Sequence, residues 1–457
     1  MTENLNTIAA ISTAQGDGGI GVIRISGADS ITIADRVFKS VGGKRLADMQ
    51  GYTAAYGKIS SGGEELDEAV ALVFRAPHSY TGENVVELSC HGGVYITKQV
   101  LRAVLEAGAA PAQAGEFTKR AFLNGKLDLT EAESVMDIIG AKNRAAARAA
   151  LCVREGALRK RISGVKDSLL SLSAHLSAWA DYPEEDIPEV TGEMITDVCS
   201  KAEAELASLL STYDSGQAVK QGIDTVIAGR PNVGKSTLMN LLSGYEKSIV
   251  TDIPGTTRDI VEDTVCAGDV ILRLSDTAGL RDTEDAVEKI GVERAKERLK
   301  QCGLLLAVFD NSSTLEEFDR QLLGMADEVP AIAVINKTDL PNRLDIKEIE
   351  SKMTGVVYIS ALTGEGREEL IRAISDIAGT DRLDPSEGIL SNERQRLNVR
   401  NALAAVREAN EAIMSGMTFD AVTVMLEDAV TELLEMTGER TSDEVIDRVF
   451  HNFCVGK

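Results

Sequence analysis

A glycine-bounded loop near the middle of the chain limits the possible folds more than any other segment. Residues 229–236 read Gly-Arg-Pro-Asn-Val-Gly-Lys-Ser, which matches the phosphate-binding pattern G-x-x-x-x-G-K-[ST]. A β-rich run precedes the loop, and residues 237–242 predict a helix after it. In such loops the glycines let backbone amides face phosphate oxygens, the lysine contacts the β- and γ-phosphates, and the serine hydroxyl binds Mg²⁺. The pattern predicts a nucleotide-binding α/β domain.

Three further motifs follow this loop, each after a strand-like run, in the order expected of a GTPase. Asp-Thr-Ala-Gly at 276–279 offers an Asp on the Mg²⁺ side and a Gly near the γ-phosphate. Asn-Lys-Thr-Asp at 336–339 ends in a carboxylate that can accept from the N1–H and exocyclic amine of guanine, a pattern that adenine lacks. Ser-Ala-Leu at 360–362 is placed to meet the base edge. The predicted GTP contacts are Gly229, Asn232, Val233, Gly234, Lys235, Ser236, Thr237, Thr251, Thr256, Thr257, Asp276, Thr277, Ala278, Gly279, Asn336, Lys337, Asp339, Ser360 and Ala361.

The segment 251–259 lies where GTPases carry a switch loop. Such a loop needs a threonine hydroxyl to complete the Mg²⁺ shell, so Thr257 is the predicted Mg²⁺ ligand beside Ser236, with Thr256 as the alternative. Some GTPases place a water-orienting Gln directly after Asp-x-x-Gly, but here that position is Leu280. We therefore expect either a slow enzyme or one that uses another polar group and another positive charge.

Strand-like runs around the loop predict a mostly parallel sheet covered on both faces. They lie at 225–228, 270–275, 304–310, 331–335 and 356–359, and helical stretches separate most of them. This G domain is expected at 216–380. Residues 1–118 read as a separate α/β domain, whereas 119–215 and 381–457 have the apolar periodicity of helices. Because the helical segments flank the G domain, we expect it to be inserted into one helical domain; a linear string of four domains is the alternative.

Two helix starts within the helical segments have the spacing of a capping box. The first pairs Thr130 with Glu133, and the second pairs Thr441 with Glu444.

The charge of the chain restricts how it could bind a polyanion. Its 457 residues include 48 Lys and Arg against 72 Asp and Glu, a net charge of −24, so RNA is not attracted over the whole surface. A local basic patch or a partner is needed. One basic cluster, for which a solvated helix face is the alternative, contains Arg148, Arg154, Arg159, Lys160, Arg161 and Lys166.

The cysteine pattern and the hydropathy bear on the compartment. The six scattered cysteines form no C-x-x-C pair, which indicates reduced thiols. No run approaches the ~18 apolar residues of a membrane span. We expect a cytoplasmic protein with no membrane association.

Short motifs outside the G domain complete the pattern. They are Gly-Val-Ile-Arg-Ile-Ser-Gly at 21–27, Ser-Tyr-Thr-Gly-Glu at 79–83, Glu-Leu-Ser-Cys-His-Gly-Gly at 87–93, Gly-Glu-Phe-Thr-Lys-Arg-Ala-Phe-Leu-Asn-Gly-Lys at 115–126 and Phe-Cys-Val-Gly-Lys at 453–457. With the G motifs, they make the chain resemble the MnmE (TrmE) family of tRNA modification GTPases from end to end.

The resemblance implies a role for the first domain. In this family the domain is similar to folate-binding aminomethyltransferase domains, forms a homodimer and holds 5-formyltetrahydrofolate or a related tetrahydrofolate. The implied folate contacts are Arg24, Glu87, Lys126 and Lys457. Arg and Lys suit the anionic tail of a folate, and a carboxylate suits the amine edges of the pterin.

The resemblance also implies a GTPase that K⁺ and G-domain dimerisation activate. Asn232 matches the K⁺-binding Asn, with Thr251, Ile253 and Thr256 as further ligands, and the ion would supply the charge that an arginine finger supplies elsewhere. Glu288 matches the family's water-orienting carboxylate; from the sequence alone, a helix-surface acid is the alternative. Glu288 and Lys235 are thus the predicted catalytic residues of the G domain.

Finally, the resemblance implies a partner and an RNA substrate. With an FAD- and NADH-using MnmG-type protein, in a heterotetramer, the family adds aminomethyl or carboxymethylaminomethyl groups to C5 of the wobble uridine of certain tRNAs. Cys454 matches a cysteine suspected of catalysis; thiolate attack at C6 of a pyrimidine would activate C5, and simple packing near Phe453 is the alternative.

Two other functions stay open from the sequence. One is a ribosome-assembly GTPase switch of the Era type, without covalent RNA chemistry, although no G-x-x-G loop follows residue 381. The other is a folate-dependent one-carbon transferase that GTP regulates.

Overall fold

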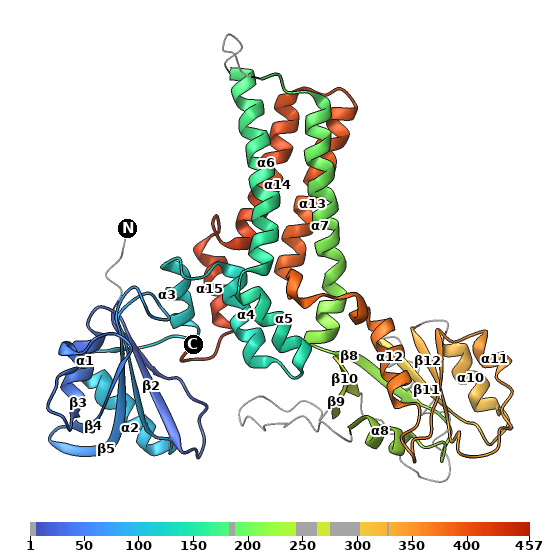
Figure 1. The fold of residues 1–457 in the computed structure, drawn as a ribbon, viewed down its shortest axis with the longest axis horizontal. Coiled ribbons are helices and arrows are strands. Elements are labelled where there is room, and N and C mark those ends of the chain that lie inside the picture. The colour runs from blue at the N-terminus through green and yellow to red at the C-terminus, as the bar shows by residue number, and fades with distance from the viewer. Residues whose placement is uncertain (1–5, 182–187, 244–262, 275–301, 327–328) are drawn as a thin grey trace. The chain divides into compact units, whose positions relative to one another are not determined.

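The computed structural model describes residues 6–181, 188–243, 263–274, 302–326 and 329–457 (Figure 1). Its contacts divide the chain into two compact units. The first unit consists of residues 1–136 and 430–457, and the second consists of residues 137–429.

The first unit is built on a seven-stranded sheet in the order β3-β4-β5-β6-β2-β1-β7, antiparallel except between β1 and β7. Its strands are β1 (Ile8–Ile11), β2 (Ile20–Ser26), β3 (Phe38–Ser40), β4 (Thr53–Ser61), β5 (Glu64–Phe74), β6 (Val85–His91) and β7 (Ala110–Pro111). Helices α1 (Ser30–Val37) and α2 (Val94–Glu106) cover one face; a 3-10 turn, η1, spans Leu46–Asp48. Strand alternation sends Ile23 and Leu88 into this core, so Arg24 and Glu87 lie on the opposite face.

A smaller core in the same unit joins its N-terminal segment to its C-terminal segment. It combines α3 (Glu116–Leu123), the start of α4 (Leu129–Gly140) and α15 (Asp443–His451), and Leu129, Phe450 and Phe453 are buried in it. The segment after α15 then forms a bridge between Val455 and Ala114.

Both capping boxes predicted from the sequence were placed wrongly. At α4 the Asp128 carboxylate accepts from Glu131 N (2.7 Å) while Glu131 accepts from Asp128 N (2.9 Å). Thr130 lies inside the helix, and its hydroxyl donates to Asp128. At α15 the cap is Ser442, which accepts from Val445 N, rather than Thr441. In each case the capping oxygen belongs to a residue one or two positions from the predicted one, and a pattern of residue types cannot rank neighbouring candidates.

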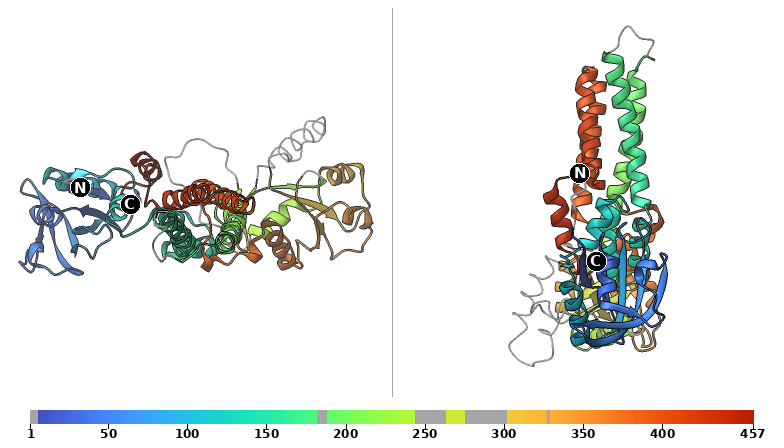
Figure 2. Two further views of the ribbon diagram at one scale, coloured as in Figure 1. Left: turned by 90° about the horizontal axis from the view of Figure 1, so that it is seen from above. Right: turned by 90° about the vertical axis from the view of Figure 1, so that its left-hand side faces the viewer.

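Long helices form a bundle in the second unit. They are α5 (Arg144–Arg154), α6 (Ala157–Asp181), α7 (Gly192–Lys220), α13 (Glu393–Met414) and α14 (Phe419–Thr437), the last of which continues into the first unit. Helices α6, α7, α13 and α14 run side by side in all views (Figure 2). Arg407 Nε pairs with Glu203 (2.7 Å) across α13 and α7, and the Trp179 and Phe419 rings meet edge-on at 5.4 Å.

The second sheet has six strands in the order β13-β12-β11-β8-β10-β9. These are β8 (Ile223–Ala228), β9 (Asp263–Ala267), β10 (Val270–Leu274), β11 (Leu304–Asp310), β12 (Ala331–Asn336) and β13 (Gly355–Tyr358). One face packs on α8 (Lys235–Ser243) and α12 (Arg367–Ala378), and the other on α10 (Glu317–Met325) and α11 (Lys347–Glu350). Only the β9–β10 pair is antiparallel, so the predicted mostly parallel, doubly covered sheet is confirmed.

The α/β segment enters and leaves the bundle at one place. Near the end of α7, Gln217 Nε2 and Lys220 Nζ both donate to the carbonyl oxygen of Ser391, just before α13 (3.0 and 2.9 Å). Two 3-10 turns, η3 (Thr380–Arg382) and η4 (Pro385–Glu387), lead back to the bundle. The G domain is therefore inserted into a helical domain; the predicted residue boundaries stay predictions.

No helix within the described ranges combines the length and apolar character that a membrane span requires.

Candidate nucleotide and folate sites

The phosphate loop connects β8 to α8 and curls tightly against β11 and β12. A Cβ on Gly229 would lie 2.4 Å from the Val308 carbonyl oxygen, and one on Gly234 would lie 2.2 Å from Asn336 Nδ2. Gly234 has φ +100°, a conformation that side chains rarely adopt. Both glycines of the motif are therefore required by the geometry of the loop.

The polar groups of the loop gather where phosphates would bind. Lys235 Nζ folds over the loop and donates to the carbonyl oxygens of Gly229 (2.8 Å) and Arg230 (2.7 Å). Asn232 has φ +65° and is exposed. Ser236 and Thr237 are exposed in the first turn of α8, where the helix dipole favours an anion.

The guanine side of the site is joined to the phosphate loop by one buried amide. Asn336, only 3% exposed, donates through Nδ2 to Val233 O (2.8 Å) and accepts at Oδ1 from Ala361 N (2.9 Å). Asp339 Oδ1 accepts from Ser360 Oγ (2.7 Å). The structure thus brings these five predicted contacts together.

An acid that the sequence analysis missed holds the lysine of the guanine motif. Lys337 has φ +65°, and its ammonium pairs with Asp310 Oδ2 at 2.5 Å. Burial alone would raise the pKa of Asp310, but hydrogen bonds from Lys337 and Ser312 outweigh it and lower the pKa. The sequence offered one signal for this role: Asp310 is a charged residue that directly follows the apolar residues of β11.

Arg230 anchors the phosphate loop to α10. Its guanidinium pairs with Glu316 and with Asp319 (2.9 Å), whose side chain is 1% exposed. Burial nevertheless raises the pKa of Asp319.

Part of the predicted GTPase site lies outside the described residues. This set comprises Thr251, Ile253, Thr256, Thr257, Asp276, Thr277, Ala278, Gly279 and Glu288.

Three of the four predicted folate contacts meet on the open face of the first sheet. Arg24 Nε bonds Glu87 Oε1 at 2.8 Å across β2 and β6, where the two residues are in register. The guanidinium lies 5.4 Å from the ring centre of Tyr80 and 5.6 Å from that of Phe117. It is therefore fixed by a carboxylate and two aromatic rings.

The C-terminal segment completes this cluster. Gly456 O accepts from Ser12 Oγ (3.1 Å) and Arg24 Nη1 (3.4 Å), and Lys457 O accepts from Phe117 N (3.2 Å). Burial, and next the charge of Arg24, lower the pKa of Lys457, while Glu87 and Cys454 oppose this shift.

The other two predicted residues of this unit are exposed. The Cys454 thiol is accessible. Lys126 instead donates to Pro77 O (3.4 Å), in the loop that also carries Tyr80, and no contact joins its described side chain to Arg24, Glu87 or Lys457.

His91, at the end of β6, forms a pair with Asp67. Its Nδ1 lies 2.7 Å from Asp67 Oδ1, and its backbone N donates to Oδ2 (2.8 Å). The hydrogen bond and charge of Asp67 raise the pKa of His91; His91, against the effect of burial, lowers the pKa of Asp67.

This pair predicts a pH-dependent stabilisation. Because the folded-state pKa of Asp67 is lowered, the stabilisation is fully present above about pH 4 and is lost as the pH falls further. Because the folded-state pKa of His91 is raised, the stabilisation is also lost as the pH rises above about 6.5 and passes through the His91 pKa. NMR titration should give His91 a pKa above the ordinary value, and Asp67→Asn should return it to that value. Glu65→Gln, two residues from Asp67 on β5, is the control that leaves the pair intact, since the Glu65 carboxylate contacts Lys58 instead; equal His91 titration in all three proteins would contradict the pair.

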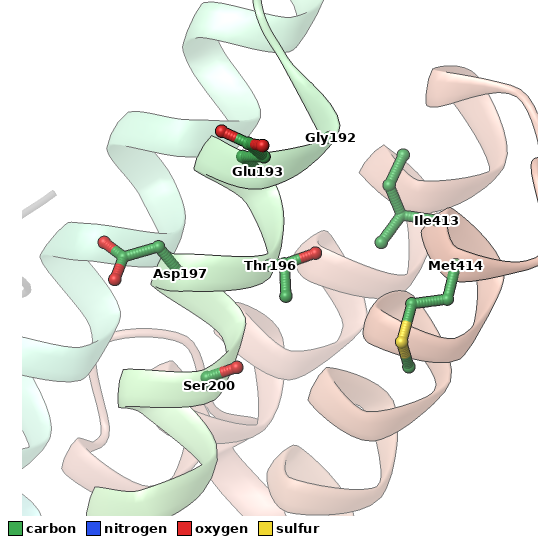
Figure 3. Close-up of a pocket in the computed structure, with 7 residues that line it drawn as sticks. All are labelled: Gly192, Glu193, Thr196, Asp197, Ser200, Ile413 and Met414. Carbon is green, nitrogen blue, oxygen red and sulfur yellow. The ribbon is translucent and has the colours of Figure 1, made fainter.

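A surface pocket of about 520 Å³ lies in the helical bundle (Figure 3). It is lined by Gly192, Glu193, Thr196, Asp197, Ser200, Ile413 and Met414, none of which is a predicted site residue. Asp197 pairs with Lys201 (2.6 Å).

Part of the basic cluster of the helical segment forms ion pairs and hydrogen bonds within the protein. Arg161 is 15% exposed, pairs with Glu205 at 2.5 Å and bonds Ser208 on α7. Arg161 therefore joins α6 to α7 instead of presenting a free charge to RNA.

Comparison with known proteins shows similarity along the whole chain. One family model, the MnmE helical domain, matches residues 129–454, and another, the N-terminus of the GTP-binding protein TrmE, matches residues 7–126. The chain is 43% identical over 455 residues to the tRNA modification GTPase MnmE of Symbiobacterium thermophilum, covering 99% of both chains. It is 43% identical over 463 residues to the protein of the same name from Geobacillus kaustophilus, covering 100% of both.

Proposed function

The chain belongs to the MnmE family of tRNA modification GTPases, and from this we propose that it is a potassium-activated GTPase of tRNA wobble-uridine modification. With an FAD-dependent MnmG-type partner, in a heterotetramer, it adds an aminomethyl or carboxymethylaminomethyl group to C5 of that uridine in the cytoplasm. The observation that carries the proposal is the pairing, in one chain, of a guanine-nucleotide site around Asn336 and a separate Arg24–Glu87–Lys457 cluster.

Hydrolysis in this proposal uses the residues of the G domain. Lys235 and the first turn of α8 hold the phosphates, Asp339 reads guanine, and Glu288 orients the attacking water. Ser236, an exposed hydroxyl at the start of α8, suits a Mg²⁺ ligand beside Thr257. Asn232 suits K⁺ with Thr251, Ile253 and Thr256 because its amide lies exposed on the loop. The two cations would neutralise charge on the phosphates.

Potassium is expected to accelerate GTP hydrolysis several-fold or more over sodium, since no arginine of the phosphate loop is free to supply the charge. The measurement is the hydrolysis rate in KCl and NaCl at matched ionic strength. Asn232→Ala should remove the difference, and Asn342→Ala, outside the site, should retain it. Equal rates of the parent protein in both salts would exclude the potassium role.

The first unit in this proposal holds 5-formyltetrahydrofolate or a related tetrahydrofolate. Glu87 would face the pterin amines, while Arg24, Lys126 and Lys457 would favour the anionic tail. On the same sheet Tyr56 and Val70, paired across β4 and β5, are 53% and 41% exposed, and a homodimer would cover them. The exposed Cys454 would attack C6 of the uridine.

Analysis of tRNA nucleosides tests the whole proposal. Cells that lack the chain should lose C5-modified wobble uridine, and re-expression should restore it. A GTPase switch of the Era type predicts unchanged uridines, and a GTP-regulated one-carbon transferase predicts turnover of a small substrate without RNA. Unchanged modification would therefore overturn the proposal.

A further inference from the structure

We infer that Asn143 is a positioning residue through which the helical domain sets the rate of GTP hydrolysis. It lies outside the nucleotide site, at the start of α5, and none of the sequence motifs includes it.

Both ends of the Asn143 side-chain amide are used, and they serve different parts of the unit. Oδ1 caps α5 by accepting from Ala146 N (2.7 Å). Nδ2 donates to Asp269 O (2.9 Å), in the turn between β9 and β10, and more weakly to Val219 O (3.4 Å) near the end of α7. One side chain thus connects two helices of the bundle to a turn of the G domain.

The turn that Asn143 holds is tightly placed. Gly268 has φ +62°, and a Cβ there would lie 2.8 Å from Ile371 Cγ2 of α12. Next to the turn, Cys266 Sγ lies 3.9 Å from Lys142 O, the residue before Asn143. The bundle therefore touches the hairpin at its closed end.

The open end of the same hairpin faces the nucleotide site. Leu274, the last residue of β10, pairs with Asp263 of β9 and with Thr225 of β8, the strand that leads into the phosphate loop. Arg273 bonds both carboxylate oxygens of Asp224, at 2.8 Å each, which locks β10 to β8. Asp276 follows Leu274 by two residues, and the predicted ligand Thr257 precedes Asp263 by six.

A stiff five-residue strand pair, about 16 Å long, thus joins Asn143 to the point where both predicted switch segments leave the sheet. The nucleotide itself is held by groups on other strands and loops, such as Lys235 and Asn336. Loss of the Asn143 bonds should therefore slow hydrolysis without weakening GTP binding.

The test separates the coupling from the helix cap. Asn143→Asp keeps an oxygen that can accept from Ala146 N but removes the donors to Asp269 and Val219. The matched control is Asn392→Asp, the same change at the cap of α13, where Oδ1 accepts from Gln395 N (2.9 Å). In the full-length chain, Asn143→Asp should lower kcat about tenfold and leave the calorimetric Kd for GTP within about twofold. The control should keep both values.

A second readout reports on the bundle directly. Hydrogen exchange at the Ala146 amide should be as slow in Asn143→Asp as in the parent protein, because Oδ1 of either side chain can accept from that amide. An intact cap together with a lowered kcat would assign the loss to the missing donor bonds. Parental kcat in Asn143→Asp would overturn the inference. So would an equal loss of kcat and GTP affinity, or equal loss in the Asn392→Asp control, because either would indicate a merely structural role.

Discussion

Replacing Asn336 with alanine is expected to weaken GTP binding by about 100-fold. The change removes two bonds, to Val233 O (2.8 Å) and from Ala361 N (2.9 Å). Because Asn336 is 3% exposed, water cannot readily replace the lost partners. A buried polar group left without a partner costs about 1–3 kcal/mol, and two such groups on opposite sides of the nucleotide account for an effect of this size. Calorimetric titration of GTP gives the affinity directly.

Asn342→Ala is the matched control for this prediction. That residue makes a local bond, accepting from Leu344 N two positions along (2.9 Å), so its removal should leave GTP affinity unchanged. An Asn336→Ala protein that binds GTP with the parental Kd would contradict the assignment of Asn336 as the link between the two halves of the site.

Replacing Gly456 with alanine is expected to release the C-terminal segment from the first sheet. A Cβ there would lie 2.3 Å from Ile11 O, and the residue has φ +98°. Movement of the segment away from Ile11 O would strain or break the bonds that Gly456 O accepts from Ser12 and Arg24. Since Lys457 belongs to the proposed folate cluster, binding of 5-formyltetrahydrofolate should fall at least tenfold, on the order of 1.4 kcal/mol or more. Fluorescence or calorimetric titration measures the loss.

Gly62→Ala separates steric overlap from backbone strain. Gly62, in the turn between β4 and β5 of the same unit, has φ +60°, but nothing lies within 4 Å of a Cβ built on it. Its substitution should cost only about 1 kcal/mol of folding stability and leave folate binding intact. If both variants bound folate like the parent protein, the docked C-terminal segment would have no part in the site.

Five of the six strands of the G domain could be predicted closely because their signal is local, whereas β9 (Asp263–Ala267) was missed. The apolar run at 304–310 became β11 (Leu304–Asp310) without change, and that at 331–335 became β12 with only Asn336 added. Buried parallel strands are continuous apolar runs, which the sequence displays directly. Helix starts were less certain: Asp128 and Ser442 cap α4 and α15, one or two residues from the predicted positions.

The site itself was predictable only where a motif fixes the spacing. Gly229, Lys235, Asn336 and Ser360 belong to such motifs, and the structure brings them to one edge of the sheet. Asp310 belongs to no motif. Its contact with Lys337 arises because β11 lies beside β12, and a single sequence does not show which strands are neighbours.

Contacts between distant segments leave no pattern in one sequence. Asn143 meets Asp269 across 126 positions of the chain. For the same reason the Arg24–Glu87 pair could be named from the family resemblance, but its stacking between Tyr80 and Phe117 could not.

The shared acceptor Ser391 has a consequence for the architecture. Because Gln217 and Lys220 both reach this one carbonyl, the two ends of the inserted domain lie within a few ångströms of each other. A short linker from α7 to α13 could therefore replace the G domain and leave the helical bundle continuous. Another nucleotide-binding domain whose two ends lie close together could be inserted at the same place.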